Sequence, residues 1–169
     1  MEKPKIRIKL DIYDVIIELL GVVGLILLIV IPMYYYSELP EIIPSHFGID
    51  GEPDNYSNKM ILWTSPIIGI LMYVGLYFLS KKPHLHNYSE ELNEFNFKIL
   101  YKISSKMIRT LNSIIIFIFV YITYSTIQTS LEKTNGLGKY FTLVFFILLF
   151  GAIVYFYLLS RKKLKITKK

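Results

Sequence analysis

Residues 19–37 read LLGVVGLILLIVIPMYYYS and contain no Asp, Glu, Lys or Arg. Three further uncharged stretches follow at 60–80, 110–131 and 140–160, and each of the four is 19 to 22 residues long. A helix of about 20 apolar residues crosses the roughly 30 Å hydrocarbon core of a bilayer. The strands of an outer-membrane barrel would be about ten residues of alternating polarity. The sequence therefore predicts an all-α integral membrane protein with four transmembrane helices, at about 15–37, 60–80, 110–131 and 140–160.

The composition of the whole chain supports this class. Of its 169 residues, 53% are hydrophobic and 19% are charged, and the mean hydropathy is +0.45. A soluble domain carries about a quarter charged residues, and a disordered chain is far less hydrophobic. The absence of cysteine excludes disulfides, thiolate metal sites and cysteine nucleophiles. We expect a single four-helix membrane domain over residues 1–169, in a multi-pass protein of a bacterial plasma membrane.

The distribution of Lys and Arg predicts the orientation. Of the 19 such residues, Lys59, Lys133 and Lys139 lie in the first and third loops, and all others lie before the first span, between spans two and three, or after span four. The positive-inside rule then places both termini in the cytoplasm and the loop 38–59 outside. The net charge of +6 is thus a membrane-surface signal. We expect the lipid bilayer as a partner and no nucleic acid, because the short basic tail is not a folded binding module.

The outer loop reads ELPEIIPSHFGIDGEPDNYSNK over residues 38–59. Its prolines and glycines interrupt long regular elements, and long irregular connections are often functional. His46 with Asp50, Glu52 and Asp54 is a weak candidate metal set, because one imidazole with carboxylate oxygens is a poor zinc signature. The same acids lack the glycine and the final glutamate of a calcium loop. We therefore expect no metal and no cofactor.

An alternative role for the same residues is structural. A buried pair of His46 and Asp54 would fix the loop and make it sensitive to pH. Gly48 and Gly51 fit turn positions with positive φ.

The cytoplasmic side carries a second expected element. Asn87 with Glu90 three positions later resembles a capping box. Apolar residues at intervals of three and four follow it: Leu92, Phe95, Ile99, Ile103 and Met107. The pattern predicts a cytoplasmic amphipathic helix before span three, lying at the membrane surface or running straight into that span.

Three features of the spans carry further expectations. Glu18 lies near the cytoplasmic end of span one, where it can pair with Lys81, Lys82 or Arg109. Pro32 and Pro66 would kink spans one and two at similar depth and open an outward-facing pocket between them. An exposed face with Gly21 and Gly24 would permit an oligomer.

One pattern in the outer loop is shared with a known family. It consists of a Leu-Pro pair, an Ile-Pro-x-His-Phe run, and then a glycine, an aspartate and a lysine before span two. The matching residues here are Leu39, Pro40, Ile43, Pro44, His46, Phe47, Gly51, Asp54 and Lys59. The stretch resembles the bacterial membrane domain of unknown function in the N-terminal half of SdpI-type immunity proteins. Those proteins protect producing cells against the sporulation-delaying peptide toxin.

The resemblance and the topology together predict an immunity- or sensor-like membrane protein without enzymatic activity. Its outer loop would recognise or exclude a secreted peptide toxin, and its cytoplasmic side could bind a regulator. The expected recognition residues are Pro44, His46, Phe47, Gly51, Asp54 and Lys59. A transporter or transporter-accessory subunit, using the pocket between spans one and two, is the first alternative. A membrane metallohydrolase using His46 and the loop acids is the second.

Overall fold

The structure is a computed structural model that describes residues 3–89 and 91–167. Within this part of the chain, four helical segments are long and apolar enough to cross a membrane. The prediction of a multi-pass protein with four spans is confirmed at this level. The elements follow in the order α1 (Ile12–Tyr35), the 3₁₀ helix η1 (Tyr36–Glu38), β1 (Ile42–Phe47), β2 (Pro53–Asn58), η2 (Lys59–Trp63), α2 (Thr64–Ser80), η3 (Pro83–Leu85), α3 (Phe97–Ser130) and α4 (Phe141–Thr167).

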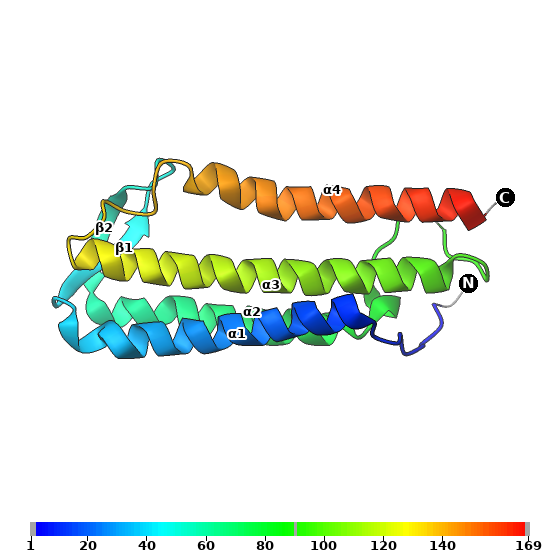
Figure 1. Cartoon of the computed structure of the whole chain (residues 1–169), viewed down its shortest axis with the longest axis horizontal. Helices are drawn as coiled ribbons and strands as arrows, with labels where there is room; N and C mark the ends of the chain where they lie inside the picture. Colours follow the sequence, from blue (N-terminus) through cyan, green and yellow to red (C-terminus); the bar gives the residue numbers. More distant parts are fainter. Residues whose placement is uncertain (1–2, 90, 168–169) are drawn as a thin grey trace.

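The long helices run side by side, and the connections are sorted between the two ends of the bundle (Figure 1). Both ends of the described chain and the α2–α3 connection lie at one end, and the β1–β2 hairpin and the α3–α4 loop lie at the other. α3 contacts each of the other three long helices. α3 is therefore the central helix of the fold.

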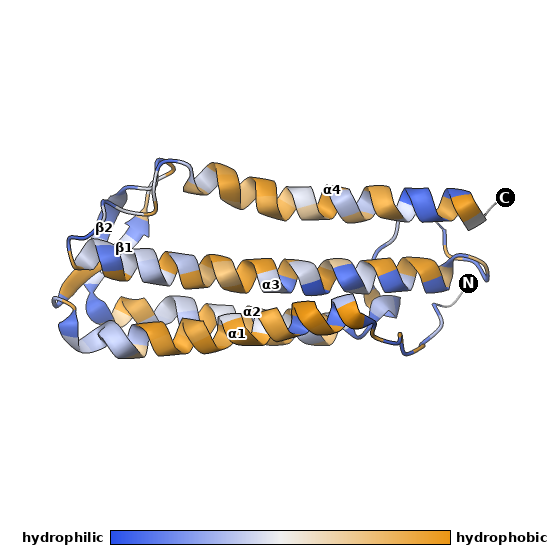
Figure 2. Ribbon diagram, viewed as in Figure 1, coloured by the Kyte–Doolittle hydropathy of each residue, from blue (hydrophilic) through white to orange (hydrophobic). Residues whose placement is uncertain are grey.

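The polarity of the helices agrees with this arrangement. α1 and α4 are mostly apolar along their length, whereas α3 alternates between polar and apolar residues (Figure 2). Several buried side chains of α3 are polar, and Asn112 donates a hydrogen bond to the carbonyl oxygen of Tyr73 on α2 at 3.1 Å. A central helix can bury polar side chains inside the bundle, where some of them bond neighbouring helices, whereas the outer helices present apolar side chains to lipid.

The centre of the bundle is tightly packed. Leu28 of α1, Tyr73 of α2 and Ile116 of α3 form a buried cluster. A Cβ atom on Gly21 would lie 2.7 Å from the Tyr73 ring, and one on Gly24 would lie 2.7 Å from Ile116. Both glycines are therefore buried where helices meet, and the prediction that they form an exposed face for an oligomer is wrong.

The same cluster bears on the pocket expected between the first two spans. Leu28 and Tyr73 occupy the space between α1 and α2. Pro66 lies in the first turn of α2, directly after the 3₁₀ helix η2. A proline is accommodated in a first turn because the backbone N–H there has no partner within the helix. Pro66 therefore does not produce the expected mid-helix kink.

The connection from α2 to α3 differs from the expected amphipathic helix. Residues 86–89 and 91–96 are not helical, and α3 begins at Phe97. The Asn93 side chain accepts hydrogen bonds from the backbone N–H groups of Phe95 and Asn96, both at 3.0 Å, and such local bonds compete with helix formation. The capping role of Asn87 is thus wrong, and Glu90 lies outside the described residues. From Phe97 onward the helix runs straight into span three, which is one of the two arrangements predicted for this segment.

Candidate functional site

The loop between α1 and α2 folds as a β-hairpin, so the fold is not all-α. β1 and β2 are antiparallel with Ile43 opposite Ser57 and Pro44 opposite Tyr56, and the register shifts on both sides of His46. Ile43 is fully buried against Leu39, Leu62 and Ile127. This contact anchors the hairpin on η2, directly before α2, and on the end of α3.

The base of the hairpin is closed by Lys59. Its backbone N–H donates to the carbonyl oxygen of Glu41 at 2.9 Å, and its ammonium group forms an ion pair with the Glu41 carboxylate at 2.9 Å. The ammonium group also lies 5.3 Å from the centre of the Tyr36 ring. Lys59, expected to recognise a ligand, therefore joins the hairpin to the end of α1.

The turn between the strands is held by its own hydrogen bonds. The N–H of Gly48 donates to the carbonyl oxygen of Glu52 at 2.8 Å, and Asp50 accepts from the N–H of Glu52 at 3.1 Å. Gly51 has φ +84°, which confirms the positive φ predicted for it. Gly48 is not among the residues with positive φ, and that part of the prediction is wrong. A Cβ atom on Gly48 would instead lie 2.8 Å from the Asp50 carboxylate.

This turn packs backbone to backbone on the loop between α3 and α4. The N–H of Leu137 donates to the carbonyl oxygen of Gly51 at 2.7 Å, and the Thr142 hydroxyl donates to that of Ile49 at 2.9 Å. A Cβ atom on Gly136 would overlap the Gly51 oxygen, and one on Gly51 would lie 2.5 Å from the Gly138 oxygen. The hairpin and the 131–140 loop thus form one unit, which we call the cap.

His46 and Asp54 form a pair on the surface of the cap. His46 Nδ1 lies 2.6 Å from Asp54 Oδ1, and the two side chains are 68% and 52% exposed. The predicted pairing is present, but the pair is exposed rather than buried. A site of this kind is available to a ligand from solution and contributes little to stability.

The other predicted residues of the loop occupy different positions. Pro44 and Gly51 are buried and shape the hairpin, and Phe47 is half-buried beside its strand partner Pro53. Within residues 3–89 and 91–167, no three His, Cys, Asp or Glu side chains gather closely enough to hold a metal ion. The four weak metal candidates are thus not brought together as one ligand set.

Between the hairpin turn and the end of α3 lies a cavity of about 600 Å³, which we call the polar cavity. Sequence reasoning missed it, because it depends on the packing of two loops that are far apart in the chain. The glycines at 136 and 138, which allow that packing, were the available signal. The side chains that give it its chemistry are Asp50, Glu52, Tyr124, Ser125, Gln128 and Lys139.

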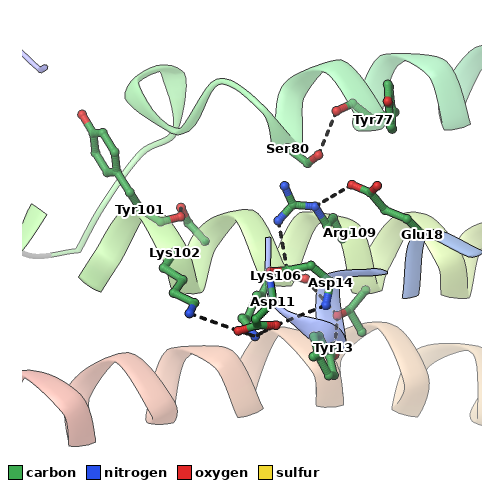
Figure 3. A network of polar contacts seen from close by, with 12 residues as sticks. Asp11, Tyr13, Asp14, Glu18, Tyr77, Ser80, Tyr101, Lys102, Lys106 and Arg109 are labelled. Atoms are coloured by element: carbon green, nitrogen blue, oxygen red, sulfur yellow. Dashed lines mark hydrogen bonds and ion pairs between the residues drawn. The ribbon is translucent and has the colours of Figure 1, made fainter. Parts of the chain in front are cut away.

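A cluster of charged residues joins α1 and α3 at the opposite end of the bundle (Figure 3). Arg109 bonds Asp14 at 3.1 Å and Glu18 at 2.9 Å, which confirms the predicted pairing of Glu18 with Arg109. Asp11, directly before α1, bonds Lys106 at 2.7 Å and Lys102 at 3.0 Å. Hydrogen bonds from these two lysines hold the pKa of Asp11 well below its usual range.

One family model matches the hairpin and parts of its two flanking helices. Residues 23–70 match the family described as a domain of unknown function (DUF1648). An uncharacterized protein of Archaeoglobus fulgidus is 39% identical over 49 residues, which are 29% of this chain and 27% of that protein. The chain thus spans about a quarter of the length of this curated relative. No solved structure matches the chain.

Proposed function

We propose that the protein is a small immunity- or sensor-like protein of a bacterial plasma membrane, whose cap recognises or excludes a secreted peptide toxin. The observation that carries the proposal is the folded cap, which presents the exposed His46–Asp54 pair at one end of a membrane bundle. The resemblance of residues 39–59 to the N-terminal half of SdpI-type immunity proteins supports the choice of a peptide toxin as ligand.

The proposed orientation places the cap outside the cell and both termini in the cytoplasm. The sorting of the connections supports it, because the end that carries the cap holds three of the 19 Lys and Arg residues. The positive-inside rule assigns the basic end to the cytoplasm. A regulator would then bind at that basic end.

The charge of the cap favours a cationic peptide. The hairpin loop carries Glu38, Glu41, Asp50, Glu52 and Asp54 against a single lysine, which is already paired with Glu41. A negative surface attracts cationic membrane-active peptides before they reach the lipid. The exposed imidazole and carboxylate of the His46–Asp54 pair then offer hydrogen-bonding groups that give selectivity among such peptides.

A protection assay tests the proposal. Wild type, His46→Ala and Asp54→Asn are expressed in a sensitive Gram-positive host, which is challenged with a panel of secreted membrane-active peptides. His84→Ala, which changes a histidine at the other end of the bundle, is the matched control. We expect wild type and the control to protect against one peptide and the two cap variants to lose protection at equal membrane abundance. Equal protection by all four proteins would contradict the role of the pair.

The two alternatives make separate predictions. A transporter would move a substrate across reconstituted vesicles, although the packing of Leu28 against Tyr73 leaves the expected route between α1 and α2 filled. A metallohydrolase would contain stoichiometric zinc after purification, which elemental analysis measures.

A further inference from the structure

A second cavity of about 670 Å³ lies below the cap, along α3 and between α1 and α4; we call it the apolar groove. Its walls are almost entirely apolar, and they include Ile17 of α1, Phe117 of α3 and Val144 and Leu148 of α4. At 1.5 Å per residue, the α3 wall from Thr110 to Tyr121 is roughly 16 Å long, about half of the hydrocarbon core of a bilayer. The groove therefore has the length of one leaflet and suits an acyl chain.

The apolar groove and the polar cavity adjoin at the edge of the cap. Tyr121, Gly138 and Lys139 line both of them. The Tyr121 hydroxyl donates to the carbonyl oxygen of Leu137 at 2.7 Å, and the Tyr121 ring stacks on Phe141. The junction is thus a fixed border between an apolar compartment and a polar one, as the two halves of an amphiphile require.

The charges of the polar cavity indicate the kind of head group. Asp50 and Glu52 bring two carboxylates and Lys139 brings one ammonium group. Ser125 and Gln128, both buried, add hydrogen-bonding side chains. A head that carries both a phosphate and a primary amine complements this set, because Lys139 can bind the phosphate while a carboxylate accepts from the amine.

We propose that the apolar groove and the polar cavity form one binding site for a zwitterionic aminophospholipid of the bilayer, such as a phosphatidylethanolamine. One acyl chain lies in the groove against α3 and α4, and the head group lies under the hairpin turn beside Lys139. A phosphatidylcholine head lacks the N–H donors for Asp50 and Glu52, and a phosphatidylglycerol head lacks the amine. The site therefore selects phosphatidylethanolamine from both.

Native mass spectrometry of the full chain tests the site. The protein is released from vesicles of equal parts phosphatidylethanolamine, phosphatidylcholine and phosphatidylglycerol, and the retained lipid is identified. We expect one retained phosphatidylethanolamine, preferred over each competitor by about fivefold, the effect of one partly exposed ion pair. Equal retention of the three lipids would show ordinary boundary lipid and overturn the proposal.

Matched variants separate the two halves of the site. Val144→Trp fills the groove, whereas Val154→Trp changes an equally exposed valine of α4 outside it (49% and 53%). We expect the first to lose the retained lipid and the second to keep it. Lys139→Gln and Glu52→Gln should abolish the head-group preference, whereas Lys133→Gln in the same loop should not. Identical behaviour within either matched set would overturn the proposal.

A membrane-active peptide is the other ligand that the experiment must distinguish from a lipid in the apolar groove. A membrane-active peptide that is retained in place of lipid by wild type, and lost in Val144→Trp, would assign the groove to the peptide and overturn the lipid site. Lipid retention is measured without any toxin, so its outcome is independent of the protection assay.

Discussion

The guanidinium group of Arg109 on α3 contacts two carboxylates of α1, those of Asp14 and Glu18, one helical turn apart. The side chains of Arg109 and Asp14 are 5% and 1% exposed. Each charge is thus removed from water and depends on the other for compensation. The contact fixes the register between the two helices at the end of the bundle away from the cap.

Arg109→Met should therefore destabilise the bundle strongly. It leaves Asp14 buried without its cation, and such a loss costs about 3–5 kcal/mol. The free energy of unfolding in detergent micelles is the measurement. Lys162→Met, which removes an exposed charge near the end of α4, is the control and should change that free energy by less than about 1 kcal/mol. Equal stability of the two variants would contradict the role of the buried pair.

His86 should make the α2–α3 connection sensitive to mild acid. Its Nε2 donates to the carbonyl oxygen of Leu79 at 2.9 Å, and its Nδ1 lies 3.0 Å from the Ser104 hydroxyl. Burial lowers the pKa of His86 below the ordinary 6.5, with smaller contributions from the charges of His84 and Lys3. The unfolded chain then binds the proton more readily than the folded chain, so stability falls as pH drops below about 6.5.

The melting temperature of wild type should accordingly be lower at pH 5.5 than at pH 7.5, and His86→Gln should reduce that difference. Two nearby groups with shifted pKa values, Tyr88 and Asp11, do not titrate in this window. Burial raises the pKa of Tyr88 to about 12. Asp11, whose pKa is lowered by Lys106 and Lys102, affects stability only as the pH falls below about 3.8, the ordinary value for an aspartate. An unchanged difference in His86→Gln would assign the pH effect to another group.

The packing of the hairpin turn on the α3–α4 loop predicts a local effect of alanine at Gly51. The positive φ alone costs an L-residue about 1–2 kcal/mol, and the added Cβ would lie 2.5 Å from the Gly138 oxygen. We expect Gly51→Ala to speed hydrogen exchange across residues 42–58 while the long helices keep their protection. Gly75→Ala is the control, because its Cβ would meet nothing within 4 Å. Unchanged exchange in Gly51→Ala would show that the cap does not depend on this contact.

The helices could be predicted from the sequence because each residue of a membrane span must be apolar or find a partner for its polar group. A charge such as Glu18 must find a partner near its own depth, and Arg109 was among the few cations available. Asp14 lies four residues before Glu18 on the same helical face, so its pairing with Arg109 could have been found by the same reasoning. This pairing was missed because Asp14 lies one residue before the expected start of span one at residue 15.

The cap was harder to predict because loop-to-loop packing has no periodic signal. Pro44 and Pro53 argued against strands, yet a two-stranded hairpin consists entirely of edge strands, where proline is tolerated. The contact of Gly51 with Gly136 and Gly138 joins residues more than eighty positions apart through backbone atoms. No side-chain pattern in a single sequence reports such a contact. The polar cavity, which depends on it, was therefore missed as well.

The exposed His46–Asp54 pair gives the prediction that separates function from stability. Because both side chains are more than half exposed, Asp54→Asn should change the free energy of unfolding by less than about 1 kcal/mol. Under the proposed function the same variant should lose most of its protection against the peptide. Chemical denaturation in micelles and the protection assay are run on the same preparations, with Asp50→Asn as the control that alters a turn carboxylate instead. A large loss of stability in Asp54→Asn would mean that the pair holds the hairpin together, and the loss of protection would then carry no information about recognition.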